Sequence, residues 1–429
     1  MKWVYAEQIG KYLGQDVVIK GWVYHLRSSG KIRFVVLRDG TGLVQCVIAQ
    51  AESESAFDAF DELTQETSCV IEGMVREDER APGGYEVVAR DLKIVHRAMP
   101  YPITPKEHGV AFLMQHRHLW LRSSRQHAIM RVRAEVMNAC RDYLNDQGFI
   151  EVDAPVFTPS ASEGTSTLFE AEYFGSKAYL SQSGQLYNEA TCMALARVYC
   201  FGPTFRAEKS KTRRHLTEFW MLEPEMAFGD LEMVFNLAEG MVCYIAERVL
   251  ERKSNELRTL ERDRSCLERI RPPFSRITYD EAIAILKEKG HDVERGDDLG
   301  GDEETTISLA FDKPVFIHRY PAKAKAFYME PDPEDDALAM CTDMIAPEGY
   351  GEIVGGSERI SDLALLEQRI QEWGLPRDAF EWYLDLRRFG SVPHAGFGLG
   401  IERVVAWMCG IRHIREAIPF PRLMYRVYP

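Results

Sequence analysis

The first 97 residues of the chain contain five short apolar runs that are rich in β-branched side chains. The runs cover residues 17–24, 32–37, 43–49, 69–76 and 85–95. Turn-forming residues separate some of them, as Asp-Gly-Thr-Gly at 39–42 and Pro-Gly-Gly at 82–84. Five strands in so short a segment predict a small β-barrel.

An acidic segment, residues 51–66, lies between the third and fourth predicted strands. Phe57, Phe60 and Leu63 recur in it at helical spacing. A capping helix at this place is typical of five-stranded OB barrels. We therefore predict an OB barrel over residues 1–97.

The pattern changes twice beyond residue 97. Residues 98–123 contain three prolines, Pro100, Pro102 and Pro105, which predict a linker with one short helix. From Ser124 to Gly148, apolar side chains recur every three or four residues, which predicts an amphipathic helix of about six turns. Short strands then alternate with helices predicted at 231–253, 278–289, 361–373, 377–388 and 402–409. The predicted class is α+β, with a second domain at 124–429 that includes an acidic loop at 291–304.

The composition excludes several classes of protein. Hydrophobic residues make up 45% and charged residues 28% of the 429 residues, which is typical of a soluble globular protein. The net charge is -14, so a nucleic acid would need a local basic patch. Nine scattered cysteines without a CxxC pair fit neither a zinc ribbon nor a disulfide framework, and they favour a reducing cytoplasm. We expect neither export nor membrane insertion, because no signal-peptide core and no long apolar segment is present.

Three stretches carry candidate chemistry. Residues 148–159 (GFIEVDAPVFTP) predict a strand closed by Pro155, and residues 205–225 (FRAEKSKTRRHLTEFWMLEPE) predict two strands joined by a basic loop. Residues 396–403 (GFGLGIER) predict a glycine-rich turn before a helix. Each stretch alone also fits an ordinary structure: a helix–strand junction, a solvated hairpin tip or a packing device. No P-loop or Rossmann fingerprint accompanies them.

In this order the three stretches resemble motifs 1, 2 and 3 of class II aminoacyl-tRNA synthetases. The resemblance covers nearly the whole chain, and the barrel places it in the aspartate, asparagine and lysine subgroup. Within that subgroup the chain is most similar to asparaginyl-tRNA synthetases. The segments that carry this closer resemblance are SGQLYNE (183–189), RHLTEFWMLEPE (214–225), EIVGGSER (352–359) and IREAIPFPR (414–422). The resemblance implies a catalytic domain with an antiparallel sheet flanked by helices, and a homodimer formed through the motif 1 helix.

The resemblance also implies a site for ATP and Mg²⁺. The residues it assigns to ATP are Arg206, Glu208, His215, Phe219, Glu352 and Arg403. Adenylate formation brings two anions together, so fixed cations are needed. Arg206 and Arg403 are the implied catalytic residues: Arg206 would hold the α-phosphate and the substrate carboxylate, while Arg403 and Phe219 would enclose the adenine. Glu352 and Asp343 are the implied magnesium ligands, although their spacing is longer than in some relatives.

The resemblance assigns a further set of residues to the amino acid. They are Glu163, Gln185, Glu189, Glu223, Ser357 and Arg359. Glu163 and Gln185 would hold the ammonium group, and Ser357 and Arg359 would line the side-chain pocket. Glu189 is predicted to accept the amide NH₂ of asparagine and to repel the carboxylate of aspartate. The alternative is that Glu189 is a helix N-terminal acid that faces solvent or a neighbouring base.

The barrel carries its own candidate site. Residues 1–38 contain seven lysines and arginines against two acidic residues, so a basic face exists on an acidic chain. By resemblance, Phe34 would stack on the central uridine of an anticodon and Gln45 would hydrogen-bond to it, with Arg27 on the same basic face. The alternatives are that Phe34 belongs to the barrel core and that Gln45 is an ordinary surface residue.

The expected function is that of an asparagine–tRNA ligase. Asparagine and ATP would give asparaginyl-adenylate and pyrophosphate, and the 3′-terminal adenosine of asparagine tRNA would then take the asparaginyl group. Three alternatives remain: an aspartyl enzyme that may also charge the asparagine tRNA, a catalytically idle tRNA-binding relative, and an asparagine synthetase built on the same catalytic fold.

Overall fold

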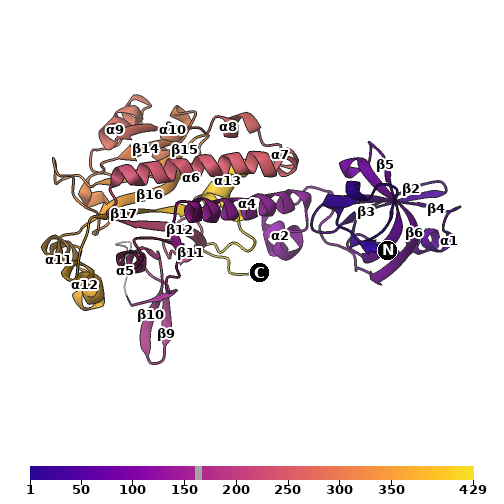
Figure 1. Cartoon of the computed structure of the whole chain (residues 1–429), viewed down its shortest axis with the longest axis horizontal. Coiled ribbons are helices and arrows are strands. Elements are labelled where there is room, and N and C mark those ends of the chain that lie inside the picture. Colours follow the sequence, from indigo (N-terminus) through magenta and orange to yellow (C-terminus); the bar gives the residue numbers. More distant parts are fainter. Residues whose placement is uncertain (160–166) are drawn as a thin grey trace. The chain divides into compact units, whose positions relative to one another are not determined.

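The computed structural model describes residues 1–159 and 167–429. They form two compact units, Met1–Met114 and Gln115–Pro429, so the division falls inside the predicted linker (Figure 1). The class is α+β, as predicted. Among the described residues, no helix combines the length and apolar character needed to span a membrane. All nine cysteines are free thiols.

The first unit is a closed barrel. Its strands are β1 (Lys2–Trp3), β2 (Asp16–Ser29), β3 (Ile32–Arg38), β4 (Leu43–Ala49), β5 (Ser68–Glu77) and β6 (Tyr85–His96). They lie in the order β1-β2-β3-β4-β6-β5, and pairing of β2 with β5 closes the barrel. The five predicted strands are thus confirmed, and the two-residue β1 is added beside β2. The predicted capping helix is α1 (Glu54–Ala59), followed by a 3₁₀ turn at Phe60–Glu62.

The second unit is built on an eight-stranded sheet. In spatial order its strands are β13 (Ser275–Thr278), β14 (Val315–His318), β15 (Cys341–Ala346), β16 (Gly351–Arg359), β17 (His394–Gly400), β12 (Glu218–Ala227), β11 (Arg197–Phe205) and β7 (Ile150–Glu151). Neighbouring strands are antiparallel except at the two edges, where β13 pairs with β14 and β7 with β11 in parallel. The antiparallel catalytic sheet implied by the resemblance is therefore present.

Helices α4 (Ser124–Asp146), α6 (Leu231–Arg252) and α13 (Ile401–Cys409) share one core with this sheet. The hydroxyl of Ser123 caps α4 by accepting the backbone N–H of Gln126, and Gly148 follows its end with a φ of 80°. The long predicted helix ends two residues earlier than expected. In Figure 1, α4 and α6 lie side by side, and the two helices pack against each other.

Further elements complete the second unit. They are α2 (Val110–Gln115), α3 (Arg117–Trp120), α5 (Gln185–Leu195), α7 (Ser254–Thr259), α8 (Arg264–Glu268), α9 (Tyr279–Glu288), α10 (Gly301–Ala310), α11 (Leu363–Glu372) and α12 (Glu381–Arg388), with α2 crossing the division between the units. The linker holds two short helices where one was predicted. The predicted acidic loop is wrong over residues 301–304, which begin α10. Three acidic residues in the first turn of α10 suit the positive end of a helix dipole.

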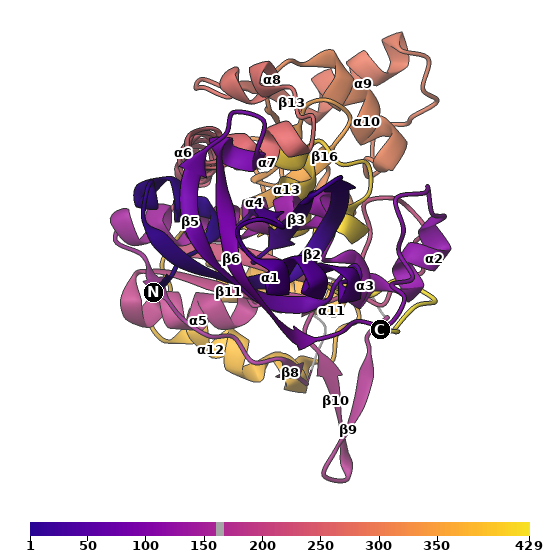
Figure 2. The same ribbon diagram turned by 90° about the vertical axis from the view of Figure 1, so that its right-hand side faces the viewer.

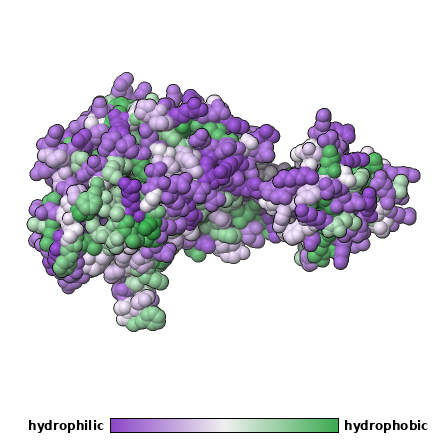
Figure 3. All heavy atoms as spheres, viewed as in Figure 1, coloured by the Kyte–Doolittle hydropathy of each residue, from purple (hydrophilic) through white to green (hydrophobic). Residues whose placement is uncertain are grey.

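A small sheet extends from the second unit. Strands β8 (Phe157–Thr158), β10 (Ser176–Leu180) and β9 (Glu170–Tyr173) form it in that order. Figures 1 and 2 both show the β9–β10 hairpin projecting from the second unit. Its tip carries apolar side chains (Figure 3), among which Phe174 is 92% exposed.

Candidate active site

Four neighbouring strands bring two of the three sequence stretches together, residues 205–225 and 396–403, while the stretch at 148–159 reaches this sheet through β7, which pairs with β11. β11 and β12 pair as a hairpin, with Phe205 opposite Glu218, so the basic loop connects their ends. β12 pairs with β17 on its other side, and β17 pairs with β16. The glycine-rich stretch forms the end of β17 and the start of α13. Residues far apart in the sequence therefore line one face of the sheet.

A first cavity lies over the ends of these strands. Its lining includes Arg206, Arg214, His215, Phe219, Glu352, Gly398, Gly400 and Arg403. The guanidinium carbon of Arg206 lies 5.4 Å from the centroid of the Phe219 ring. The structure thus brings together five of the six residues predicted for ATP, and Glu208 lies close enough to His215 to affect its pKa.

Several buried polar atoms at this cavity lack a hydrogen-bond partner among the described residues. They are Nε of Arg206, Oε2 of Glu208 and Nε2 of His215. Buried polar groups are normally paired, and an unpaired one is costly. Burial lowers the pKa of His215, which favours the neutral imidazole. These unpaired atoms suit a polar ligand, and the arginines of the lining, Arg206, Arg214 and Arg403, suit an anionic one.

Arg403 is paired with Glu352. Its Nη1 donates to the backbone oxygen of Glu352 at 2.8 Å and to Glu352 Oε2 at 2.9 Å. Burial opposes ionisation of Glu352, but Arg403 and Lys325 outweigh it and hold the pKa of the carboxyl below its ordinary value. Arg403 therefore lines the first cavity, with one edge of its guanidinium held by Glu352.

Carboxylates gather on this side of the cavity. A side chain at Gly355 would lie close to both Glu352 Oε1, at 3.1 Å, and Asp343 Oδ1, at 3.4 Å. Glu304 Oε2 accepts the backbone N–H of Glu352 at 2.9 Å, and burial and Glu352 raise the pKa of Glu304 to about 7. A cluster of oxygen ligands whose charges repel one another fits Mg²⁺. One cation is already present, because Lys325 Nζ donates to Asp343 Oδ2 at 2.7 Å.

A second cavity adjoins the first. Arg206, Met221, Glu352 and Gly398 line both cavities, so the two meet at Arg206. The second cavity is also lined by Gln185, Glu223, Glu225, Lys325, Tyr328 and Arg359. Three of the residues predicted for the amino acid, Gln185, Glu223 and Arg359, therefore face one space.

Arg359 and Glu225 form a buried ion pair in this second cavity. Arg359 Nε lies 2.9 Å from Glu225 Oε1, and Nη2 lies 3.1 Å from Oε2. Arg359 Nη1 also donates to Ser357 Oγ at 2.8 Å. Burial raises the pKa of Glu225 although Arg359 opposes this. Because a guanidinium has five N–H donors and a carboxylate about four acceptor positions, both groups keep capacity for a ligand.

The pair needs a glycine on the neighbouring strand. Gly396 lies opposite Glu225 in the β12–β17 pairing. A Cβ atom at Gly396 would overlap Glu225 Oε2 and the backbone oxygen of Pro224. The missing side chain therefore creates the space in which the Glu225 carboxylate lies.

Comparison with known proteins agrees with this geometry. The family model "tRNA synthetases class II (D, K and N)" matches residues 110–424, and an OB-fold nucleic acid binding domain matches residues 17–95. The asparagine–tRNA ligase of Desulforamulus reducens is 58% identical over 429 residues, which cover 100% of both chains. The chain belongs to the asparagine–tRNA ligase family of class II tRNA synthetases.

Solved structures support the same assignment. Asparaginyl-tRNA synthetase from Pyrococcus horikoshii, in complex with asparaginyl-adenylate, is 46% identical with a TM-score of 0.96, covering 99% of each chain. A putative aspartyl-tRNA synthetase from Leishmania major is 26% identical with a TM-score of 0.86, covering 100% of this chain and 94% of that one. The predicted family and fold class are confirmed.

Of the other residues predicted for the amino acid, Glu189 and Ser357 are not in the lining of the second cavity and Glu163 is outside the described residues, while Glu223 has a second role. Glu189 is fully buried and is not among the residues that line the cavity. Ser357 is buried against Arg359. Glu223 accepts the hydroxyl of Ser183 and, at 2.9 Å, the backbone N–H of Gly184, so it also fixes the turn before α5. Glu163 falls outside the described residues.

Glu225 was not predicted as a site residue from the sequence. Glu223 and Glu225 are two residues apart on β12, so both side chains leave the same face of the strand. This alternation along β12, together with a glycine opposite Glu225 on the neighbouring strand, is the sequence pattern that could have identified Glu225. The glycine could not be placed opposite Glu225, because the pairing partner of β12 is not apparent from local sequence.

The barrel residues lie together on one face. Arg27 of β2 pairs across the ladder with Phe34 of β3, and its guanidinium carbon lies 4.1 Å from the ring centroid. Gln45 of β4 pairs with Val36, two residues from Phe34, which places it on the same face. The Gln45 amide donates to Glu86 Oε2 at 2.7 Å, and Glu86 is fully buried. Their roles in binding an anticodon stay predictions.

Proposed function

We propose that the chain is an asparagine–tRNA ligase. The observation that carries the proposal is the Arg359–Glu225 pair in the second cavity. Asparagine offers one side-chain oxygen and two N–H donors, whereas aspartate offers only acceptors. Arg359 suits the oxygen of either substrate, and an ionised Glu225 suits the amide nitrogen alone. The names and sequences of the relatives support the same substrate.

The junction of the two cavities is the proposed reaction site. Arg206 lines both cavities, so its planar guanidinium can hold the asparagine carboxylate and the α-phosphate of ATP at once. A carboxylate oxygen attacks the α-phosphorus, and the bond to the leaving pyrophosphate breaks. Arg403 and His215 face the first cavity, where negative charge builds up. In the second step, a hydroxyl of the terminal adenosine attacks the carbonyl carbon and releases AMP.

Magnesium would be held by Glu352 and Asp343. The gathered carboxylates fit this ion, which would neutralise phosphate charge when bound. Lys325 already contacts Asp343, so Glu352, whose Oε1 faces Gly355, is the more accessible ligand. Glu208 and Phe219 complete the proposed ATP contacts.

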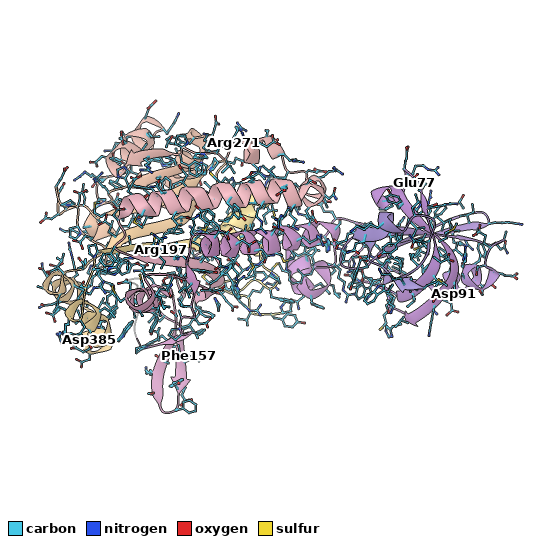
Figure 4. The ribbon with its side chains drawn as sticks, viewed as in Figure 1. Glu77, Asp91, Phe157, Arg197, Arg271 and Asp385 are labelled. Atoms are coloured by element: carbon cyan, nitrogen blue, oxygen red, sulfur yellow. The ribbon has the colours of Figure 1, made fainter. Side chains whose placement is uncertain are left out.

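The barrel would bind the anticodon of asparagine tRNA through Phe34, Gln45 and Arg27. We further propose a homodimer, supported by exposed apolar side chains within the motif 1 stretch, residues 148–159. Ile150 is 47% exposed and Phe157, labelled in Figure 4 at the base of the hairpin, is 48% exposed. The free thiols fit a cytoplasmic location, where cysteines stay reduced.

The test is amino-acid-dependent exchange of radiolabelled pyrophosphate into ATP. We expect exchange with asparagine and little or none with aspartate, followed by charging of asparagine tRNA transcripts. Equal exchange with aspartate would favour an aspartyl or non-discriminating enzyme. Exchange that depends on aspartate, without charging of any tRNA, would favour an asparagine synthetase, and the absence of exchange with either amino acid would favour an idle relative.

A further inference from the structure

Glu189 is the most densely bonded buried carboxylate near the amino-acid cavity, although it does not line the cavity. Its Oε1 accepts from Gln185 Nε2 at 3.1 Å and from the Tyr383 hydroxyl at 2.9 Å. Its Oε2 lies 2.8 Å from Arg387 Nη2 and 2.9 Å from His394 Nε2. The side chains of Glu189, Arg387 and His394 are all 0% exposed.

These neighbours require an ionised carboxylate. Tyr383, Arg387 and Gln185 all present N–H or O–H groups, and only a carboxylate can accept from every one of them on two oxygens. Burial opposes ionisation of Glu189, but Arg387 and His394 outweigh it and hold its pKa well below the ordinary value. Glu225 and Glu189 offer oxygens within 4.8 Å of each other and of a His394 nitrogen, but arginines bond to both carboxylates. This cluster is therefore an ion-pair network and not a cation site.

The network is fixed by elements distant in the sequence. Arg387 and Tyr383 belong to α12, which Asp385 marks in Figure 4. Arg387 Nε also donates to the backbone oxygen of Ile360, just after β16, at 2.8 Å. Glu189 is thus held from the far side by α12, while its near side reaches Gln185, one turn earlier on α5.

The consequence lies in the amide of Gln185. A glutamine amide has a donor end and an acceptor end. With its nitrogen bonded to Glu189, Gln185 must turn its oxygen the other way, and Gln185 lines the amino-acid cavity. We propose that Glu189 is a positioning residue for the α-ammonium group of the substrate, because it fixes the Gln185 carbonyl oxygen as the acceptor. The proposal rests on the proposed function, which supplies the ammonium-bearing substrate.

The test compares asparagine with succinamate, which is asparagine without its α-amino group. Pyrophosphate exchange by the unaltered chain gives KM for asparagine, and succinamate is assayed as a competitive inhibitor. Glu189→Asp keeps the charge beside Arg387 but withdraws the oxygen from Gln185. We expect KM for asparagine to rise about tenfold or more, as for a lost hydrogen bond to a charged group, with little change in kcat or in the Ki of succinamate.

A double-mutant cycle with Gln185→Ala identifies the route of the effect. If Glu189 acts through Gln185, the two changes together cost no more than Gln185→Ala alone. Additive effects would overturn the proposal, as would a parallel rise in KM for asparagine and Ki for succinamate. Glu135→Asp is the matched control, because Glu135 is a buried partner of Arg248 outside the cavity lining.

A thermal melt distinguishes loss of folding from loss of substrate binding, and exchange by the unaltered chain tests the proposed function itself. Glu189→Gln places an N–H among donors and is expected to raise KM for asparagine at least as much, but it can also destabilise the buried network. If this variant unfolds in a thermal melt, Glu189→Asp and the cycle decide the proposal. Failure of the unaltered chain to exchange with asparagine would refute the proposed function instead, before any variant is compared.

Discussion

The amino-acid cavity and the predicted anticodon face use charged groups in opposite ways. In the cavity, Arg359 and Glu225 are buried to 3% and 2% side-chain exposure and held in a two-point pair. On the barrel, Arg27 is exposed and lies over the Phe34 ring, with no ion pair to any residue that the structure describes. A buried charge that loses its partner is strongly destabilised, whereas an exposed cation over a ring contributes about 0.5–1 kcal/mol.

This difference means that the cavity should select its ligand strictly, whereas the barrel should bind RNA through contacts that each matter less. The cavity groups are in place before a ligand arrives, so a single changed atom should alter which ligand is accepted. On the barrel, Arg27 contacts Phe34 through an exposed cation–π pair, so this contact should contribute a modest share of affinity. The comparison would be wrong if substitutions on the barrel had larger effects than substitutions in the cavity.

The largest expected effect is the loss of a catalytic cation. Arg206→Ala removes the side chain that lines both cavities, and Arg403→Ala removes the partner of Glu352. We expect either change to reduce pyrophosphate exchange by about 100-fold or more. Thermal melting should show that both variants are folded, and near-normal exchange in either would contradict its catalytic role.

The second expected effect is a change in selection. Glu225→Gln removes the anion beside Arg359 and provides an N–H that can donate to a carboxylate. The ratio of kcat/KM for asparagine to that for aspartate should fall by about tenfold to 100-fold, since a hydrogen bond to a charged group is at stake. Glu135→Gln serves as a control for the loss of a buried negative charge elsewhere. An unchanged ratio in a folded variant would remove Glu225 from selection.

The barrel should give an intermediate effect that is confined to tRNA. Phe34→Ala removes the predicted stacking surface, and such a stack contributes about 1–3 kcal/mol per base. We expect weaker charging of asparagine tRNA and unchanged tRNA-independent exchange. Arg27→Ala should weaken tRNA charging less than Phe34→Ala does, because the contact between Arg27 and Phe34 is an exposed cation–π pair. Normal charging by Phe34→Ala would place base stacking elsewhere on the barrel.

The smallest expected effect is a dependence of selection on pH. Burial raises the pKa of Glu225, so this carboxyl takes up a proton at a higher pH than the usual value of about 4.3. Above the raised pKa the anion repels aspartate, and as the pH falls through it the repulsion is lost. The preference for asparagine should therefore decline on acidification, measured as the ratio of the two kcat/KM values. In Glu225→Gln the ratio should lose this dependence.

Much of the fold follows from local sequence. The alternation in the five barrel runs and the three- to four-residue spacing in α4 determine which faces are buried, so both elements were predicted nearly to their ends. The acids at 302–304 were taken for a loop because charge alone does not distinguish a loop from the first turn of a helix. The helix predicted over 377–388 is also shorter, since Arg377–Phe380 forms a separate 3₁₀ turn and α12 begins at Glu381.

The site was only partly predictable, for a different reason. The family resemblance predicted a shared ATP site for Arg206, Phe219, Glu352 and Arg403, and the structure brings these four residues to one cavity. The direction in which Glu189 points depends on α12, almost 200 positions later, and no local pattern contains that information. Glu225 and Lys325 were not predicted for the same reason. The partner of Glu225 is Arg359 and the partner of Lys325 is Asp343, and both partners lie on strands elsewhere in the sequence.

Gly396 has a consequence for anyone who wishes to redesign the enzyme for new amino acids. The position holds no side chain, yet it decides where the Glu225 carboxylate can rest. Even alanine there would push the acid away from Arg359 toward the open space, making the pocket smaller instead of larger. A library that enlarges the pocket should therefore leave codon 396 untouched and vary Tyr328, which borders the same space and whose ring lies 5.3 Å from the Arg359 guanidinium carbon.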